Sequence, residues 1–208
     1  MGLLKVQGTG KVFTEPDLCI LSFKLKEENK DYAKCLENLN KRTKRLREAI
    51  AKNEIDIHSL KTSDFEIKIK DRYSKGRYIF DGYEGTHRLH IELPIEEELR
   101  NRVLSTIVKS RSGAEINISF SVKDKEPIKR KALKEALRVA KENAKALSDE
   151  AGVKLGKILK IEYGWSEVRI REYSANMILE SASHYDFDIE PEELYAEDSV
   201  TITYEIID

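Results

Sequence analysis

The sequence contains few of the residues that mark several protein classes. Its 208 residues include two cysteines, two methionines, one tryptophan and four prolines. Cys19 and Cys35 are too few for a disulfide framework, so we expect two buried thiols in a reducing compartment. The longest apolar run near the start is residues 18–21, whereas a signal peptide needs ~7–15 apolar residues and a membrane span ~20. These features predict a cytoplasmic protein without a membrane span, or an exported one whose leader was removed.

Motifs of known chemistry are also missing. The sequence contains no phosphate-binding P-loop, no Gly-x-Ser-x-Gly and no His-Glu-x-x-His. His87 and His90 lie three apart on an expected strand and therefore point to opposite faces, which does not favour a shared metal. We accordingly expect no catalytic residue and no cofactor. An enzyme whose site is dispersed along the chain stays open as an alternative.

Charge is balanced in number but uneven in position. The chain holds 37 Lys and Arg against 38 Asp and Glu, and none of the basic residues follows Arg171. The last 37 residues therefore carry −11, and residues 1–171 carry +10. This asymmetry favours internal docking or self-association, with a further protein partner as another possibility. A pI near 6.5 and the lack of an RNA-binding aromatic motif argue against nucleic acid.

Two charged segments are candidate sites. The basic run in the first expected helix supplies interaction candidates, which are Arg42, Lys44 and Arg45. The acidic segment near the C-terminus has the ligand spacing of a calcium loop at positions 1, 3, 5, 7 and 12, through Asp186, Asp188, Glu190, Glu192 and Glu197. Pro191 stands where such a loop needs glycine. A cation-binding module is therefore an alternative function, and a solvated acidic loop is the simpler interpretation.

Hydrophobic periodicity predicts an α+β fold. Residues 18–26 alternate as a strand, and Asp31 is a candidate N-cap for a helix that extends to about residue 52. Strands over 63–73 and 77–94, a helix from about residue 96 and a strand over 116–122 follow. The order β-α-β-β-α-β from residue 18 to 123 predicts a split, ferredoxin-like layer.

A long Ala-rich helix and further antiparallel strands extend this layer. Pro127 begins the helix and Gly152 ends it, with five residues expected to face inward: Ala132, Ala136, Ala140, Leu147 and Ala151. Strands over 158–164 and 199–206 join the same sheet or a second one. Gly8 and Gly10 in the first strand indicate a bulge or a close backbone approach. We expect one domain over 1–208, with a possible subdivision into 14–124 and 125–208.

The hairpin around Ser74-Lys75-Gly76 carries a cluster of aromatic residues, which are Tyr73, Tyr78, Phe80 and Tyr83. Exposed Tyr and Phe beside arginines are typical of protein contact surfaces. Packing of the same rings across the two strands is the alternative. The hairpin is therefore our candidate for an apolar contact surface.

Several short segments, in order, resemble the SIMPL-domain family. They are Val6-Gln7-Gly8-Thr9-Gly10, Glu15-Pro16-Asp17, Leu60-Lys61-Thr62, Gly82-Tyr83, the Ala-rich stretch 132–156 and the closing strand 200–206. The segment 185–191 and the missing leader resemble a signal-less branch. The resemblance implies relatives at bacterial surfaces or in the periplasm, some linked to stress responses and some forming ring-like oligomers, with no shared catalytic residues. We therefore expect a non-enzymatic, self-associating interaction or scaffold protein, related to stress.

Overall fold

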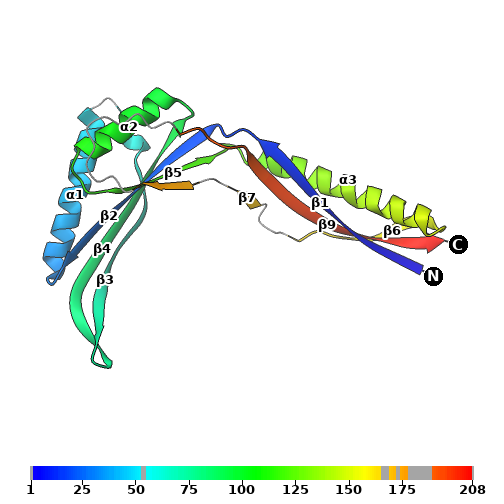
Figure 1. Ribbon diagram of the computed structural model, residues 1–208, viewed down its shortest axis with the longest axis horizontal. Helices are drawn as coiled ribbons and strands as arrows, with labels where there is room; N and C mark the ends of the chain where they lie inside the picture. Colours follow the sequence, from blue (N-terminus) through cyan, green and yellow to red (C-terminus); the bar gives the residue numbers. More distant parts are fainter. Residues whose placement is uncertain (1, 53–54, 165–168, 172–173, 178–188, 208) are drawn as a thin grey trace. The chain divides into compact units, whose positions relative to one another are not determined.

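The computed structural model describes residues 2–52, 55–164, 169–171, 174–177 and 189–207. Their contacts fall into two compact units, coloured along the sequence in Figure 1. The five-stranded unit comprises Asp17–Ser121 and Tyr173–Pro191, and the four-stranded unit comprises Met1–Pro16, Val122–Glu172 and Glu192–Asp208. The single domain over residues 1–208 stays a prediction. The four-stranded unit combines the start of the chain with two segments that follow Ser121.

The five-stranded unit has the expected split β-α-β-β-α-β order. Its elements are β2 (Leu18–Asn29), α1 (Tyr32–Lys52), a short 3-10 helix η1 (Ile57–Ser59), β3 (Lys61–Ser74), β4 (Arg77–Pro94), α2 (Glu97–Lys109), β5 (Glu115–Ser121) and β8 (Ser174–Met177). All neighbouring strands are antiparallel, in the sheet order β3-β4-β2-β5-β8. The α+β prediction and its ferredoxin-like layer are confirmed.

The core of this unit lies between the sheet and its two helices. In β2, alternate side chains from Cys19 to Leu25 are buried against the helix side. Helix α1 begins where expected, because the Asp31 carboxylate accepts a hydrogen bond from the Lys34 backbone N–H at 2.9 Å. The apolar stripe of α1 then packs Leu39, Leu46 and other residues into the same cluster. Strand β3 ends the sheet on one side, beside β4.

The four-stranded unit pairs the two ends of the chain. Its elements are β1 (Gly2–Thr14), α3 (Glu126–Glu150), β6 (Lys154–Glu162), β7 (Arg169–Arg171) and β9 (Leu194–Ile207). Strand β9 lies between β1 and β6, and β7 also pairs with β9. The β1–β9 register is unbroken over thirteen residue pairs, so the glycines of β1 do not mark a bulge. In Figure 1, α3 runs along β1 and β9.

The glycines of β1 allow α3 to approach the sheet closely. A Cβ built on Gly8 would lie 2.2 Å from the carbonyl oxygen of Ala136, and one on Gly10 would lie 2.2 Å from that of Ala132. Real Cβ atoms do not approach backbone atoms so closely. From Ala132 to Ser148, the buried stripe of α3 consists of small residues for the same reason. The close approach expected from the sequence is confirmed.

Two expected inward positions of this helix are wrong. Leu147 is 52% exposed and Ala151 is also exposed, while Ser148 is buried. The buried stripe repeats every four residues from Ile128 to Ser148, rather than at the mixed spacing of three and four. Leu147 falls one residue before that row and therefore points outward.

Candidate functional site: the β3–β4 hairpin

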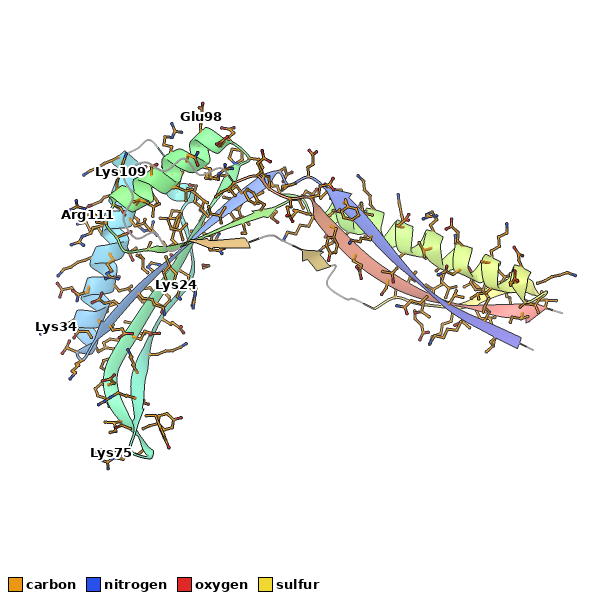
Figure 2. The ribbon with its side chains drawn as sticks, in the orientation of Figure 1. Lys24, Lys34, Lys75, Glu98, Lys109 and Arg111 are labelled. Atoms are coloured by element: carbon orange, nitrogen blue, oxygen red, sulfur yellow. The ribbon has the colours of Figure 1, made fainter. Side chains whose placement is uncertain are left out.

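The β3–β4 hairpin ends in a tight turn. Lys75 and Gly76 both have positive φ angles, of 50° and 81°, as a two-residue type I′ turn requires. Gly76 adopts this conformation without strain because it has no Cβ. Figure 2 labels Lys75 at this end of the hairpin, and Figure 1 shows the two strands extending past the start of α1.

The four aromatic residues expected at the hairpin form two edge-to-face contacts. The ring centroids of Tyr73 and Tyr78 lie 5.2 Å apart, and those of Phe80 and Tyr83 lie 5.4 Å apart. Tyr83 also contacts Tyr32 of α1 at 5.4 Å. Tyr73, Tyr78 and Phe80 nevertheless stay 66%, 75% and 52% exposed. These rings therefore pack across the two strands and stay exposed to solvent at the same time.

A bulge keeps these rings on one face of the sheet. The register passes from Lys70 opposite Gly82 to Asp71 opposite Phe80, which leaves Asp81 as an extra residue in β4. The extra residue shifts the alternation of β4, so Phe80 lies on the same face as Tyr83. This is the face that α1 covers farther along the sheet.

Sequence reasoning missed two members of this surface. Phe65 and Ile69 lie on the same face of β3, where alternation predicts core residues, yet they are 43% and 64% exposed. Helix α1 begins at Tyr32 and covers the sheet only as far as Gly85 and Tyr83. We define the hairpin strip as five exposed apolar side chains on this face: Phe65 and Ile69, which lie on the edge strand β3 opposite His87 and Tyr83, and Tyr73, Tyr78 and Phe80, which lie nearer the turn.

The three basic candidates on α1 differ from one another. The Arg42 guanidinium donates a hydrogen bond to the Lys26 carbonyl and lies 3.3 Å from the Glu27 carboxylate, so it fastens α1 to β2. Lys44 forms an exposed ion pair with Glu48 at 3.8 Å, and Arg45 is exposed. Among the described contacts, none links these three side chains to the hairpin strip. Arg42 has a structural role that the sequence did not reveal.

The other face of the five-stranded sheet is polar. Ion pairs cross its strands between Lys24 and Glu115, Lys70 and Glu28, and Arg88 and Asp64. Such exposed pairs contribute little to stability and keep the face solvated. Most of the charged side chains of the hairpin therefore lie on this face, although Asp71 lies opposite Phe80 on the apolar face.

The uneven charge along the sequence is balanced within each unit. The residues of the four-stranded unit include 16 basic and 16 acidic side chains, and those of the five-stranded unit include 21 and 22. The acidic C-terminal strand β9 is paired with β1, β6 and β7, whose side chains include lysines and arginines. The described part of the acidic C-terminal segment therefore lies within a unit whose charges balance.

The acidic segment is only partly described. Asp186 and Asp188 lie outside the described residues, while Glu190 and Glu192 are exposed. Glu197 lies within β9, opposite Lys11 of β1. No group of three or more His, Cys, Asp or Glu side chains within the described ranges is arranged to hold a metal ion. The cation-binding alternative stays a prediction.

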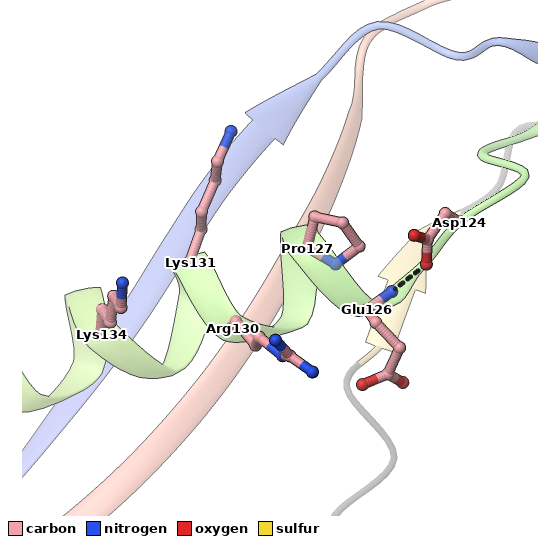
Figure 3. Close-up of a pocket in the computed structure, with 6 residues that line it drawn as sticks. All are labelled: Asp124, Glu126, Pro127, Arg130, Lys131 and Lys134. Atoms are coloured by element: carbon pink, nitrogen blue, oxygen red, sulfur yellow. Dashed lines mark hydrogen bonds between the residues drawn. The ribbon is translucent and has the colours of Figure 1, made fainter.

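A surface hollow of about 340 Å³ lies at the start of α3 (Figure 3). Asp124 accepts a hydrogen bond there from the Glu126 backbone N–H at 3.0 Å. In Figure 3, Arg130 and Lys131 point in different directions, so their charges do not converge on one position. The mixed charges and divergent side chains do not favour this hollow as a binding site.

Both cysteines are buried free thiols, as expected. Burial raises the pKa of the Cys19 thiol to about 11, although the nearby Arg100 opposes the shift. Burial also raises the pKa of Cys35, whose Sγ donates to the Glu27 carbonyl at 3.5 Å. A raised pKa keeps a thiol protonated and unreactive near neutral pH. The two cysteines therefore act as core residues.

His87 is held as a buried, neutral side chain. The Thr43 hydroxyl donates to the Leu39 carbonyl at 3.0 Å, so it accepts from His87 Nδ1 at 2.9 Å. The imidazole then carries its proton on Nδ1, and Nε2 accepts from the Thr62 hydroxyl at 3.0 Å. Burial lowers the pKa of His87, and the positive charge of Arg47 lowers it further. This arrangement ties α1 to β3 and β4.

We expect the free energy of unfolding to fall as the pH drops below about 6.5. The unfolded chain takes up a proton at His87 near that pH, whereas the folded chain, with its lowered pKa, does not. For one proton, the free energy of unfolding changes by at most about 1.4 kcal/mol per pH unit. Urea unfolding of the parent and of His87→Gln between pH 5 and 8 measures this contribution. His58→Gln, at an exposed histidine, is the matched control, and an equal slope in the parent and His87→Gln would contradict the assignment.

Comparison with known proteins identifies the family. Residues 4–204 match the SIMPL family, which is described as a protein of unknown function (DUF541). The chain belongs to the SIMPL family. The uncharacterized protein YggE of Edwardsiella ictaluri (strain 93-146) is 25% identical over 173 residues, which cover 81% of this chain and 72% of that protein. In the described part of the chain, no helix is long and apolar enough to cross a membrane.

Proposed function

We propose that this SIMPL protein is a self-associating interaction or scaffold protein and that it acts by binding rather than by catalysis. The observation that carries the proposal is the hairpin strip, whose five apolar side chains are 43–75% exposed and lie on one face. Contiguous exposed apolar side chains are typical of contact surfaces, and tyrosine and phenylalanine are enriched there. A second copy of the chain is the partner we propose.

The proposal includes two broader points. The buried, free thiols of Cys19 and Cys35 support a cytoplasmic location, where thiols stay reduced. A role related to stress is supported by the resemblance to the SIMPL family. Neither point is needed for the self-association itself, which can be tested on the purified chain.

We expect the purified chain to have at least twice its monomer mass of 24.0 kDa at 10–100 µM. Size exclusion with light scattering measures this mass at low and at high salt. Because the hairpin strip supplies apolar contacts, assembly should persist at high salt, where exposed charges are screened. A monomeric parent at 100 µM would overturn the proposal.

Variants can show whether the hairpin strip is the contact surface. The double variant Tyr78→Ser and Phe80→Ser should weaken assembly, whereas Phe13→Ser should not. Phe13 is a suitable control because it is 55% exposed but belongs to the four-stranded unit. A variant that tests the basic residues of α1 in assembly should reverse the charge of Lys44 and Arg45 only. Replacing Arg42 would also break its contact with Glu27.

A further inference from the structure

In the described part of the chain, one backbone edge of strand β3 has no partner strand. It is the last strand of its sheet and pairs only with β4 among the described strands. Irregularities interrupt its register between Thr62 and Asp64 and between Lys70 and Asp71. The regular segment between them, Asp64–Lys70, is seven residues long, and Ile67 is its central residue. An open edge of this kind offers unpaired N–H and C=O groups to another strand.

The charges of this segment are arranged symmetrically about Ile67. Asp64 and Glu66 precede it and Lys68 and Lys70 follow it, so one half is acidic and the other basic. These four side chains share the face of the sheet that points away from the helices. If a second copy of the strand pairs antiparallel about Ile67, Glu66 lies opposite Lys68, and Asp64 lies opposite Lys70. All four cross-strand positions then join opposite charges, which stabilises a strand pair.

The apolar face of the same segment is self-complementary too. Under that register Phe65 lies opposite Ile69, and Ile67 lies opposite its own copy. Phe65 and Ile69 belong to the hairpin strip and are 43% and 64% exposed in the single chain. Aromatic and β-branched residues form favourable cross-strand pairs. Both faces of the segment therefore select one and the same register.

We propose that two copies of this chain join through β3 in an antiparallel pair, with a two-fold axis at Ile67. This inference rests on the proposed self-association and names its contact strand and register. The contact is isologous, because each residue of one copy meets its symmetry partner in the other. Backbone hydrogen bonds between the two edges continue both sheets into one, as in strand addition to a sheet.

Existing ion pairs do not prevent this contact. Lys68 is bound to Glu66 of the same strand at 2.9 Å, with its side chain 64% exposed. Exposed pairs of this kind contribute little, so exchanging or sharing them with a second copy costs little. Edges that avoid pairing usually carry charges that repel a second copy or a proline. The segment Asp64–Lys70 has no proline, and its two signs of charge attract a second copy.

Charge exchange tests the register. Glu66→Lys and Lys68→Glu each place like charges opposite one another twice, so each single variant should dimerise about tenfold more weakly than the parent. An equimolar mixture of the two should regain dimers, because each copy then meets an opposite charge. The double variant with both substitutions restores attraction within its own homodimer and should match the parent. Sedimentation equilibrium of the full chain measures all four samples.

Disulfide trapping tests the axis directly. Facing residues of antiparallel strands have Cα atoms about 4.5–5.5 Å apart, which lies within the range of a disulfide. Ile67→Cys should therefore crosslink to itself under mild oxidation. Phe65→Cys and Ile69→Cys should crosslink poorly alone but efficiently when mixed. Cys19 and Cys35 are buried and do not compete.

The outcomes separate this inference from the proposed function. If the parent is an oligomer but the charge variants assemble like it and the Ile67→Cys variant does not crosslink, the β3 register is wrong while self-association stands. If the parent is a monomer at 100 µM, both fail. The self-association and the β3 register are both supported if the single variants, the mixture, the double variant and the crosslinks all behave as expected above.

Discussion

A single methyl group at position 8 should remove about 4 kcal/mol or more of the stability of the four-stranded unit. The Cβ of Gly8→Ala would lie 2.2 Å from the Ala136 carbonyl oxygen and 2.3 Å from the Ala140 backbone nitrogen. These are backbone atoms of a helix and cannot rotate away, so α3 must move off the sheet. Its contacts with Val6, Val200 and Ile202 then loosen as well. Overpacking that shifts a whole element lies at the severe end of point substitutions.

Urea unfolding compares this variant with two matched glycine substitutions. Gly85→Ala should be milder, because its nearest neighbour is the flexible end of the Leu39 side chain at 3.1 Å. Gly164→Ala should change stability by less than about 0.5 kcal/mol, since its Cβ would meet open space. If Gly8→Ala unfolds at the same urea concentration as Gly164→Ala, α3 does not contact β1 in this way.

Local signals in the sequence predicted the elements well. Asp31 begins α1 with the expected hydrogen bond, and Lys75-Gly76 forms the expected turn. The glycines at 8 and 10 indicated a close approach before any partner for it was known. Each of these features depends on a few neighbouring residues, and such patterns can be read along the chain.

The partners of the later strands could not be predicted in the same way. The alternation of β9 shows which side chains share a face, but it fits either sheet equally well. Only the structure places β9 between β1 and β6. Charge along the sequence left open whether the acidic C-terminal segment docks within the chain or against a second copy, and the structure places β9 beside β1 and β6, which carry lysines.

The candidate site was predicted in part. Tyr73, Tyr78 and Phe80 are on the exposed hairpin as expected. Phe65 and Ile69 were missed because alternation identifies the face of a strand but not how far a helix covers it. The structural contact of Arg42 was missed for a related reason, since Glu27 lies in a different element and its position depends on the tertiary fold.

Phe23→Ala should cost about 3–5 kcal/mol of stability in the five-stranded unit. Phe23 is only 1% exposed and lies on β2, with Leu89 of β4 and Ile116 of β5 directly beside it. Truncation removes the transfer free energy of the ring and leaves a cavity between the sheet and its helices. The cavity stays open because neighbouring strands and helices are fixed by their own hydrogen bonds.

Phe65→Ala is the matched control for this variant, because it removes the same ring from the edge strand β3, where the side chain is 43% exposed. We expect a loss of about 1 kcal/mol or less there, since much of the ring already contacts water.

Hydrogen exchange then shows in which unit Phe23→Ala and Gly8→Ala each lower the stability. If the chain is one cooperative domain, as the sequence predicts, Phe23→Ala and Gly8→Ala speed exchange by global unfolding in both units alike. Faster exchange confined to β2, β4 and β5 in Phe23→Ala, and to β1, β9 and α3 in Gly8→Ala, would instead show two domains that unfold separately.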